Sequence, residues 1–325
     1  MATPRGSAVV GLGIGTEHVR AMRRQPERFQ IRAVCDPDES RSTAVAERIG
    51  ADVQGLDEIL RRDDIEIVAL CTPPHLHREQ IEQVLRAGKH CVCEKPLVGN
   101  VAHLDEVEAI ERESAGTLMP VFNYRYGHGL QKLKLLIDRG LTGRLYSASM
   151  VLAWRRTAAY YAVPWRGRKA TELGGILLSH AVHGLDAFLY LLGRPAEVLS
   201  RHATLVNDIE TEDTAAAILR YDDGALVTVN ATLGSFEEMS QHRFAFERVS
   251  AASGVEPYTF TDDPWTFAHE SPEIDEALAS YEPRRDGWTG QYERFADALD
   301  AGEPPPVTID DARAVIELVL EMYEQ

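Results

Sequence analysis

Residues 7–16 read Ser-Ala-Val-Val-Gly-Leu-Gly-Ile-Gly-Thr, and they decide how the first part of the chain is expected to fold. A short apolar run that ends in glycine is typical of a buried strand followed by a tight turn. A helix through Ala21 and Met22 is expected after the turn. The stretch therefore predicts a strand, a glycine-rich loop and a helix in direct succession.

The alternation of strand and helix continues as far as residue 122. The further apolar runs are continuous, as in the strands of a parallel sheet that is buried on both faces. Helices are expected between them, with Gly50 and Gly88 at helix ends and Asn100 as an N-cap. This order predicts an α/β fold with a doubly wound parallel sheet. The expected strands are Ile31–Cys35, Ile65–Cys71, Lys89–Cys93 and Leu118–Phe122.

The pattern changes from about residue 123. Helices are predicted at 127–139 and 176–192, among strands of alternating polarity. The clearest strand pair, 214–221 and 225–233, is joined by Asp222-Asp223-Gly224, and an Asp-Gly turn is a strong hairpin signal. This part of the chain therefore predicts an antiparallel or mixed sheet with helices on one side.

The last third of the chain is less regular. Residues 250–288 show the weakest periodicity and are expected to form surface loops, whereas Thr308 is expected to cap a closing helix through Tyr323. No internal repeat or long linker interrupts the chain. We therefore predict two domains, residues 1–122 and 123–325.

The glycine loop partly matches the dinucleotide-binding pattern Gly-x-Gly-x-x-Gly. Gly11 suits the tight turn and Gly13 suits a close approach of the backbone to a pyrophosphate, but Thr16 stands where the third glycine is expected. Gly15 comes one residue early, after Ile14. Asp36 ends the next strand, close to the spacing of about 20 residues that is typical of a ribose-binding carboxylate. The predicted cofactor-binding residues are Gly11, Gly13, Ile14, Gly15 and Asp36.

Asp36 also bears on the choice of cofactor. A carboxylate at this place accepts hydrogen bonds from a ribose 2′-hydroxyl and repels a 2′-phosphate, and Asp38 and Glu39 add to the repulsion. The nearest downstream base is Arg41. These residues favour NAD over NADP. If Asp36 only capped a helix, the choice would stay open.

Glu94-Lys95-Pro96, directly after the fourth predicted strand, resembles the Gfo/Idh/MocA family, named for glucose–fructose oxidoreductase and inositol dehydrogenase. Further stretches are similar to that family in the same order, from the first strand to about residue 192. They are Thr72-Pro73-Pro74-His75-Leu76-His77, Ala87-Gly88-Lys89-His90, Asn123-Tyr124-Arg125, Trp165-Arg166, and Gly174-Gly175 followed by His183 and Asp186.

The resemblance implies an N-terminal Rossmann domain and a C-terminal α+β domain with an open, mostly antiparallel sheet that often serves oligomerisation. It implies that Lys95 reaches the substrate near the nicotinamide, where an ammonium group can hydrogen-bond the reacting oxygen. The further residues expected near the cofactor are Thr72, Pro73, His77, Glu94, Lys95, Trp165 and Arg166. Those expected near the substrate are Lys95, Tyr124, Arg125, Ser179, His180 and His183.

The predicted helix at 176–192 is apolar around most of its circumference. Ser179, His183, Asp186 and Tyr190 form one narrow polar stripe, with His180 beside it. Buried polar groups need partners or a wet cavity, and a hydrogen-bonded core histidine is the alternative interpretation. The resemblance to the family's substrate-facing helix makes His183 the candidate general base, with an ordinary pKa of about 6.5.

One position departs from the family. Its members often carry aspartate four residues before that histidine, where this chain has Ser179. Either His180 takes over part of the role, or Lys95 and His183 suffice. His180, His183 and Asp186 also have a spacing compatible with metal ligands, but the resemblance requires no metal and we expect none.

Residues 155–169 are basic in an otherwise acidic chain. Aromatic side chains accompany the bases, and the hypothesis is a loop over the nicotinamide and substrate that offers arginine to a carboxylate or phosphate. This would favour a sugar acid over a neutral polyol. The alternative is a solvated basic loop. The bases are Arg155, Arg156, Arg166, Arg168 and Lys169.

The dinucleotide fingerprint and the family resemblance together predict an NAD(P)-dependent dehydrogenase that transfers a hydride between a nicotinamide cofactor and a sugar, polyol or sugar acid. Two alternatives stay open. One is a dinucleotide-binding regulatory protein without catalysis, and the other is a glycoside hydrolase that uses NAD transiently.

Composition limits the partners. A formal net charge of −17 argues against nucleic acid, and no stretch of about 18 apolar residues predicts a membrane span. The four cysteines lack CxxC spacing and are expected to be core residues in a reducing compartment. We therefore expect a cytoplasmic protein, and the family resemblance adds the expectation of a small carbohydrate substrate and of assembly as a homodimer or homotetramer.

Overall fold

The computed structural model describes residues 3–258, 260–261 and 264–324. Contacts divide the chain into two compact units. The first holds the residues up to Phe122 together with Trp288–Arg313, and the second holds Asn123–Gly287 together with the residues from Ala314 onward. The predicted domain limits stay a prediction; in this division, residues 288–313 group with the first unit although the sequence places them in the second domain.

The first unit contains a six-stranded sheet in the order β3-β2-β1-β4-β5-β6, with every pair parallel. This is the strand order of a Rossmann fold, so the predicted doubly wound sheet is confirmed. The strands are β1 (Arg5–Val10), β2 (Phe29–Cys35), β3 (Asp52–Val53), β4 (Ile67–Leu70), β5 (His90–Cys93) and β6 (Leu118–Pro120).

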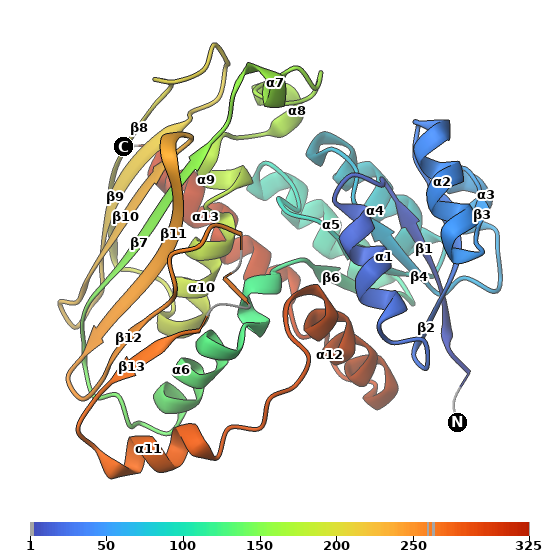
Figure 1. Ribbon diagram of the computed structural model, residues 1–325. Helices are drawn as coiled ribbons and strands as arrows, with labels where there is room; N and C mark the ends of the chain where they lie inside the picture. Colours follow the sequence, from blue (N-terminus) through green and yellow to red (C-terminus); the bar gives the residue numbers. More distant parts are fainter. Residues whose placement is uncertain (1–2, 259, 262–263, 325) are drawn as a thin grey trace. The chain divides into compact units, whose positions relative to one another are not determined.

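Helices connect these strands (Figure 1). Asn100 caps α5 by accepting the backbone N–H of His103, and Gly50 and Gly88 are left-handed at helix ends, as predicted. The connecting helices are α1 (Gly15–Arg23), α2 (Glu39–Ile49), α3 (Leu56–Leu60), η1 (Pro74–Leu76), α4 (His77–Arg86) and α5 (Val101–Glu113). From its second residue, α12 (Gly287–Ala301) also belongs to this unit.

The second unit is built on a seven-stranded sheet in the order β13-β12-β11-β7-β10-β9-β8. All its pairs are antiparallel except β7 with β10, so the mostly antiparallel open sheet is confirmed. Gly224 is left-handed in the predicted β9–β10 hairpin. The strands are β7 (Leu145–Arg155), β8 (Glu197–Ala203), β9 (Thr214–Arg220), β10 (Leu226–Thr232), β11 (Gly234–Phe246), β12 (Ser250–Ala252) and β13 (Thr266–Ala268).

Figure 1 shows α9 and α10 on one face of this sheet. Phe188 of α10 contacts the rings of His242 and Phe244 on β11, which fixes the helix to the sheet. The helices and turns of this part are η2 (Asn123–Tyr126), α6 (His128–Asp138), α7 (Ala158–Tyr161), α8 (Lys169–Glu172), α9 (Ile176–Ser179), α10 (Val182–Leu192), α11 (Pro272–Ala279) and α13 (Ile309–Tyr323, which begins in the first unit).

Two expectations for this unit were wrong. The single helix at 176–192 is two helices, because His180 leaves the helical conformation (φ −121°, ψ −54°) while Ser179 bonds its ring. Residues 250–288 are not only loops: they contain β12, β13 and α11, and Phe260 and Ile274 are buried. Three-residue strands are too short to show alternation in a sequence.

Among the residues that the structure describes, no single helix has the length and apolar character of a membrane span. Lys169–Ser179 and Val182–Leu192 reach that threshold only as a pair, bent by 53°.

Candidate active site

The glycine loop lies at the carboxyl end of β1. The steric reason for having glycine differs among its three positions. At Gly11 φ is +88°, and a Cβ would lie 2.5 Å from the carbonyl oxygen of Cys71. A Cβ on Gly13 would meet nothing within 4 Å among the described residues, which leaves its surface open to a ligand. A Cβ on Gly15 would lie 3.0 Å from Cγ1 of Val9, so Gly15 permits the helix–strand packing that the third glycine usually provides.

The N-terminus of α1 follows this loop directly. Ile14 is its N-cap residue, and within the described part of the chain no side chain caps the first-turn amides. Exposed amides at a helix N-terminus bind anions such as a pyrophosphate. The residues present therefore fit a dinucleotide, although the contacts of Gly11, Gly13, Ile14 and Gly15 with it stay a prediction.

Asp36 is tied to the glycine loop. Its carboxylate accepts the N–H of Leu12 at 2.6 Å and the N–H of Asp38 at 2.9 Å, and Arg41 lies 3.3 Å away. The N-cap of α2 is Asp38, which accepts the N–H of Arg41. The alternative in which Asp36 only caps the helix is therefore wrong, because the carboxylate organises the loop beside the expected ribose site.

Glu94 and Lys95 follow β5 at the same edge of the sheet. Glu94 is buried, and its Oε2 accepts the N–H of Lys95 at 3.1 Å. Its Oε1 is hydrogen-bonded to Nε2 of His18 at 3.0 Å and accepts the Nε1–H of Trp288 at 3.4 Å. Neither His18 nor Trp288 was predicted. Trp288 could not have been, since nothing in the sequence links it to a loop almost 200 residues earlier.

His77 joins the loops after β4 and β5. Its ring nitrogens lie 2.8 Å from the carbonyl oxygen of Pro96 and 2.9 Å from that of Thr72. The side chain is fully buried, and burial lowers the pKa of His77. Thr72 also donates its hydroxyl to Gln80 at 2.5 Å. Contacts of Thr72, Pro73 and His77 with the cofactor stay a prediction.

In the second unit, η2 and α10 bring four predicted side chains together. Arg125 bonds Asp186 through Nε (2.9 Å) and Nη2 (2.6 Å), and both side chains are almost fully buried. Tyr124 stacks on His183 with ring centroids 4.7 Å apart. Because a bidentate pair has a fixed geometry, Arg125 and Asp186 hold Tyr124 and His183 in register.

The pairing of Asp186 also bears on the metal alternative. Its carboxylate is occupied by Arg125, and His180 lies outside α10. Among the described residues, no group of three or more His, Cys, Asp or Glu side chains is arranged to hold a metal ion.

Ser179 and His180 belong to a second polar chain. Oγ of Ser179 donates to the carbonyl oxygen of Gly175 at 2.6 Å and lies 2.6 Å from Nδ1 of His180. Nε2 of His180 lies 3.2 Å from the hydroxyl of Tyr160, which Arg166 also bonds. Since a hydroxyl has one proton, Nδ1 of His180 carries the hydrogen and Nε2 accepts from Tyr160.

The bases of residues 155–169 differ in their exposure and in their partners. Arg168 and Lys169 are exposed, which fits the solvated loop. The side chain of Arg156 is only 14% exposed and bonds the hydroxyl of Tyr258 at 2.7 Å. Arg166 packs over the rings of Tyr160 and Trp165. The expectation that Trp165 and Arg166 contact the cofactor is not tested by these packing contacts.

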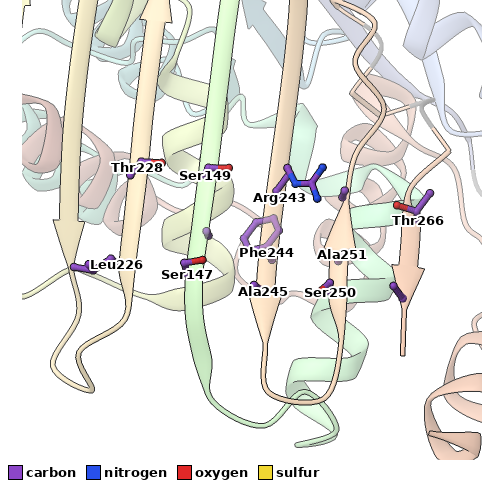
Figure 2. Close-up of a pocket in the computed structure, with 13 residues that line it drawn as sticks. Ser147, Ser149, Leu226, Thr228, Arg243, Phe244, Ala245, Ser250, Ala251 and Thr266 are labelled. Carbon is purple, nitrogen blue, oxygen red and sulfur yellow. The ribbon is translucent and has the colours of Figure 1, made fainter. Parts of the chain in front are cut away.

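A separate pocket lies on the face of the second sheet that α9 and α10 leave uncovered. Figure 2 shows Ser147, Ser149, Thr228, Arg243 and Thr266 on neighbouring strands there. None of the predicted site residues lines this pocket.

Comparisons with known proteins agree with this arrangement. Residues 5–122 match the model of the oxidoreductase family with an NAD-binding Rossmann fold, and residues 130–247 match the GFO/IDH/MocA C-terminal domain. The chain is 25% identical to the myo-inositol 2-dehydrogenase of Thermotoga maritima, over 95% of this chain and 92% of that protein. It is 26% identical to a D-xylose 1-dehydrogenase (NADP(+)) of Haloferax volcanii, over 92% and 90%.

A solved structure is also similar over almost the whole chain. The WlbA dehydrogenase from Bordetella pertussis, in complex with NADH and UDP-GlcNAcA, superposes with a TM-score of 0.86 at 26% identity. The match covers 99% of this chain and 96% of that one. The chain therefore belongs to the Gfo/Idh/MocA family of oxidoreductases, and its residues 5–122 are the NAD-binding Rossmann domain of that family.

Proposed function

We propose that the protein is an NAD-dependent dehydrogenase that transfers a hydride between the nicotinamide and a carbon of a sugar, polyol or sugar acid. The observation that carries the proposal is the carboxyl edge of the parallel sheet, where the glycine loop, Asp36 and Lys95 follow β1, β2 and β5. Ligands of such sheets bind at this edge. Relatives that are sugar and polyol dehydrogenases support the same reaction.

The chain's own residues supply binding and proton transfer. When bound, the nicotinamide accepts or returns the hydride. Lys95 hydrogen-bonds the reacting oxygen and stabilises the charge that develops on it, while His183 takes the hydroxyl proton as general base. In the reverse direction the same two side chains act as acids. Tyr124, stacked on His183, and Arg125, paired with Asp186, hold the base in place.

The remaining candidates surround this reaction. Ser179 cannot carry the charge of the aspartate common in the family, so we propose that His180, which Ser179 and Tyr160 hold by hydrogen bonds, takes over part of that role. Arg156 and Arg166 favour a substrate with a carboxylate. The similar WlbA dehydrogenase from Bordetella pertussis, solved in complex with UDP-GlcNAcA, is consistent with this preference.

We further propose that the enzyme is cytoplasmic and assembles as a homodimer or homotetramer through the uncovered face of the second sheet. One row of paired residues crosses all its strands and contains no acidic side chain in a chain of net charge −17. The row is Leu199, Ile218, Thr228, Ser149, Arg243, Ala252 and Thr266. Depletion of charged side chains is typical of an interface core.

The test is NADH absorbance with purified protein, NAD and a panel of sugars, polyols and sugar acids. The proposal predicts turnover of at least one compound, with sugar acids preferred over neutral polyols. Binding of NAD without turnover of any compound would instead favour a regulatory protein. Cleavage of a glycoside without net NADH would favour the hydrolase.

A further inference from the structure

A buried chain of hydrogen bonds in the first unit joins α1 to the peptide that precedes Lys95. His18 lies on α1 and is fully buried. Its Nε2 lies 3.0 Å from Oε1 of Glu94, and its Nδ1 lies 2.8 Å from the hydroxyl of Tyr292 on α12. Glu94 in turn accepts the N–H of Lys95 through its other oxygen. One imidazole thus lies between the helix of the glycine loop and the candidate catalytic lysine.

Hydrogen-bonding capacity fixes the tautomer of His18. Glu94 receives N–H groups from three directions and acts as an acceptor, so Nε2 of His18 carries the proton. In a neutral imidazole Nδ1 is then an acceptor, and the hydroxyl of Tyr292 donates to it. Burial raises the pKa of Tyr292, which keeps that proton in place. His18, Tyr292 and Glu94 are satisfied together in this arrangement.

Packing leaves the imidazole little freedom to turn. The ring of Tyr292 meets His18 edge-on at 5.7 Å, and the ring of Trp288 lies 6.5 Å away. Tyr292 itself is held by an edge contact with Phe29 of β2 at 5.5 Å. Because closely packed buried groups transmit strain, we expect a displacement of α1 to reach Glu94 and, through its hydrogen bond, the backbone of Lys95.

We infer that His18 is a positioning residue, which couples dinucleotide binding at the N-terminus of α1 to the placement of Lys95, with Tyr292 fixing its tautomer. The inference deepens the proposed function and rests on it, because the placement of Lys95 matters only if a substrate meets the nicotinamide there. The residue acts through Glu94 and is not expected to touch the substrate.

Two substitutions at one position test the coupling. In His18→Asn the amide takes the place of Nδ1 and does not reach Glu94, whereas in His18→Gln it reaches the place of Nε2 and can donate to Glu94. We expect H18N to weaken NADH binding and to lower kcat by about 10-fold or more, while H18Q restores most of both. NADH affinity is measured by fluorescence titration, and kcat with a substrate found in the panel.

Gln25 provides the matched control. It is also buried, and its side-chain amide donates to the carbonyl oxygen of Thr289 at 3.0 Å, so it links the same two segments away from Glu94. Gln25→Leu is expected to lower stability without changing the NADH affinity. The inference is overturned if H18N keeps the native affinity and kcat, or if Q25L reproduces the losses of H18N.

Tyr292→Phe provides a second test if H18N does not fold. It removes only the hydroxyl that bonds Nδ1 of His18. NADH binding several-fold weaker than native supports the fixed tautomer, and native affinity contradicts it. If the native protein binds NADH but turns over no compound, the proposed function fails, and the order of NADH affinities among these variants still tests the link between His18 and the dinucleotide site.

Discussion

At the scale of single residues, the proposed hydride transfer depends on two side chains with different chemical tasks. Lys95 offers a compact cation to the reacting oxygen, and His183 offers a base whose ordinary pKa lies near neutrality. Each is held by neighbours that do not react: Glu94 anchors the backbone of Lys95, and Tyr124 stacks on His183. Removal of either should therefore affect turnover more than folding.

Lys95→Ala and His183→Ala are each expected to lower kcat by roughly 10²- to 10⁴-fold, the usual contribution of a positioned acid or base. Steady-state kinetics on the best substrate of the panel measures this. NADH titration of the same samples is the control for folding. Full turnover by either variant would remove that residue from the mechanism.

Gly13→Ala separates cofactor binding from stability. A Cβ there meets no described atom within 4 Å, so the free energy of unfolding should change by no more than about 0.5 kcal/mol. The same methyl group would obstruct a pyrophosphate, and NADH affinity should fall by about 10-fold or more. Gly11→Ala is the comparison, because its φ of +88° and the nearby Cys71 oxygen predict a loss of stability as well. Native affinity in G13A would place the pyrophosphate elsewhere.

Several residues of the candidate site could be predicted from the sequence because their signals are local. Glycines, Asp36 and the Glu94–Pro96 turn are local signals, and each lies where a strand ends. His18 follows the glycine loop by three residues, but the sequence shows no partner for it, because Glu94 and Tyr292 reach it only after folding. The function of Lys95 and His183 is still a prediction.

At the scale of elements, the break between α9 and α10 is the main feature that the sequence concealed. Periodicity continues through 176–192, so one helix was expected, but the side chain of Ser179 bonds back to Gly175 and to His180. Such local bonds compete with helix geometry. The stripe is thereby split: His180 joins Tyr160, and His183 stays with Asp186 on α10.

The packing of α10 on β11 is expected to make the free energy of unfolding depend on pH. His242 is fully buried between Phe188 and Phe260, and burial lowers its pKa from 6.5 to about 4. Between these two values the unfolded chain binds a proton that the folded protein does not bind, so the free energy of unfolding falls as the pH falls. The contribution of His242 to this loss approaches roughly 3 kcal/mol below pH 4.

His242→Phe keeps a ring in the core and removes the titration. As the pH is lowered from 7 to 4, the free energy of unfolding of the variant should therefore rise relative to that of the native protein, by up to roughly 3 kcal/mol. Urea unfolding at several pH values measures the difference, and the other titrating groups cancel in it. A difference that does not change with pH would show that His242 is not neutralised by burial.

At the scale of the whole molecule, one row of residues across the uncovered face of the second sheet carries little charge in an acidic chain. The row from Leu199 to Thr266 runs across seven strands with Arg243 as its one charged member. The sequence predicted a sheet with an open face, but which residues line up depends on strand register, and register is set by pairing over long separations.

Thr228→Lys places a charge at the centre of that face. If the face joins copies of the chain, the native protein elutes as a dimer or tetramer in size-exclusion chromatography with light scattering, and T228K shifts it to smaller species. Glu47→Lys, on the exposed side of α2, is the control and should leave the assembly unchanged. A native monomer, or an oligomer that T228K does not disturb, would contradict this assembly.

The central claim is hydride transfer, and isotope transfer tests it most directly. The best substrate of the panel is prepared with deuterium on the carbon of the reacting hydroxyl and incubated with the enzyme and NAD, and the product NADH is examined by mass spectrometry. The account predicts that the deuterium appears in NADH and that Lys95→Ala slows its transfer. Consumption of the substrate with no deuterium in NADH would contradict the account.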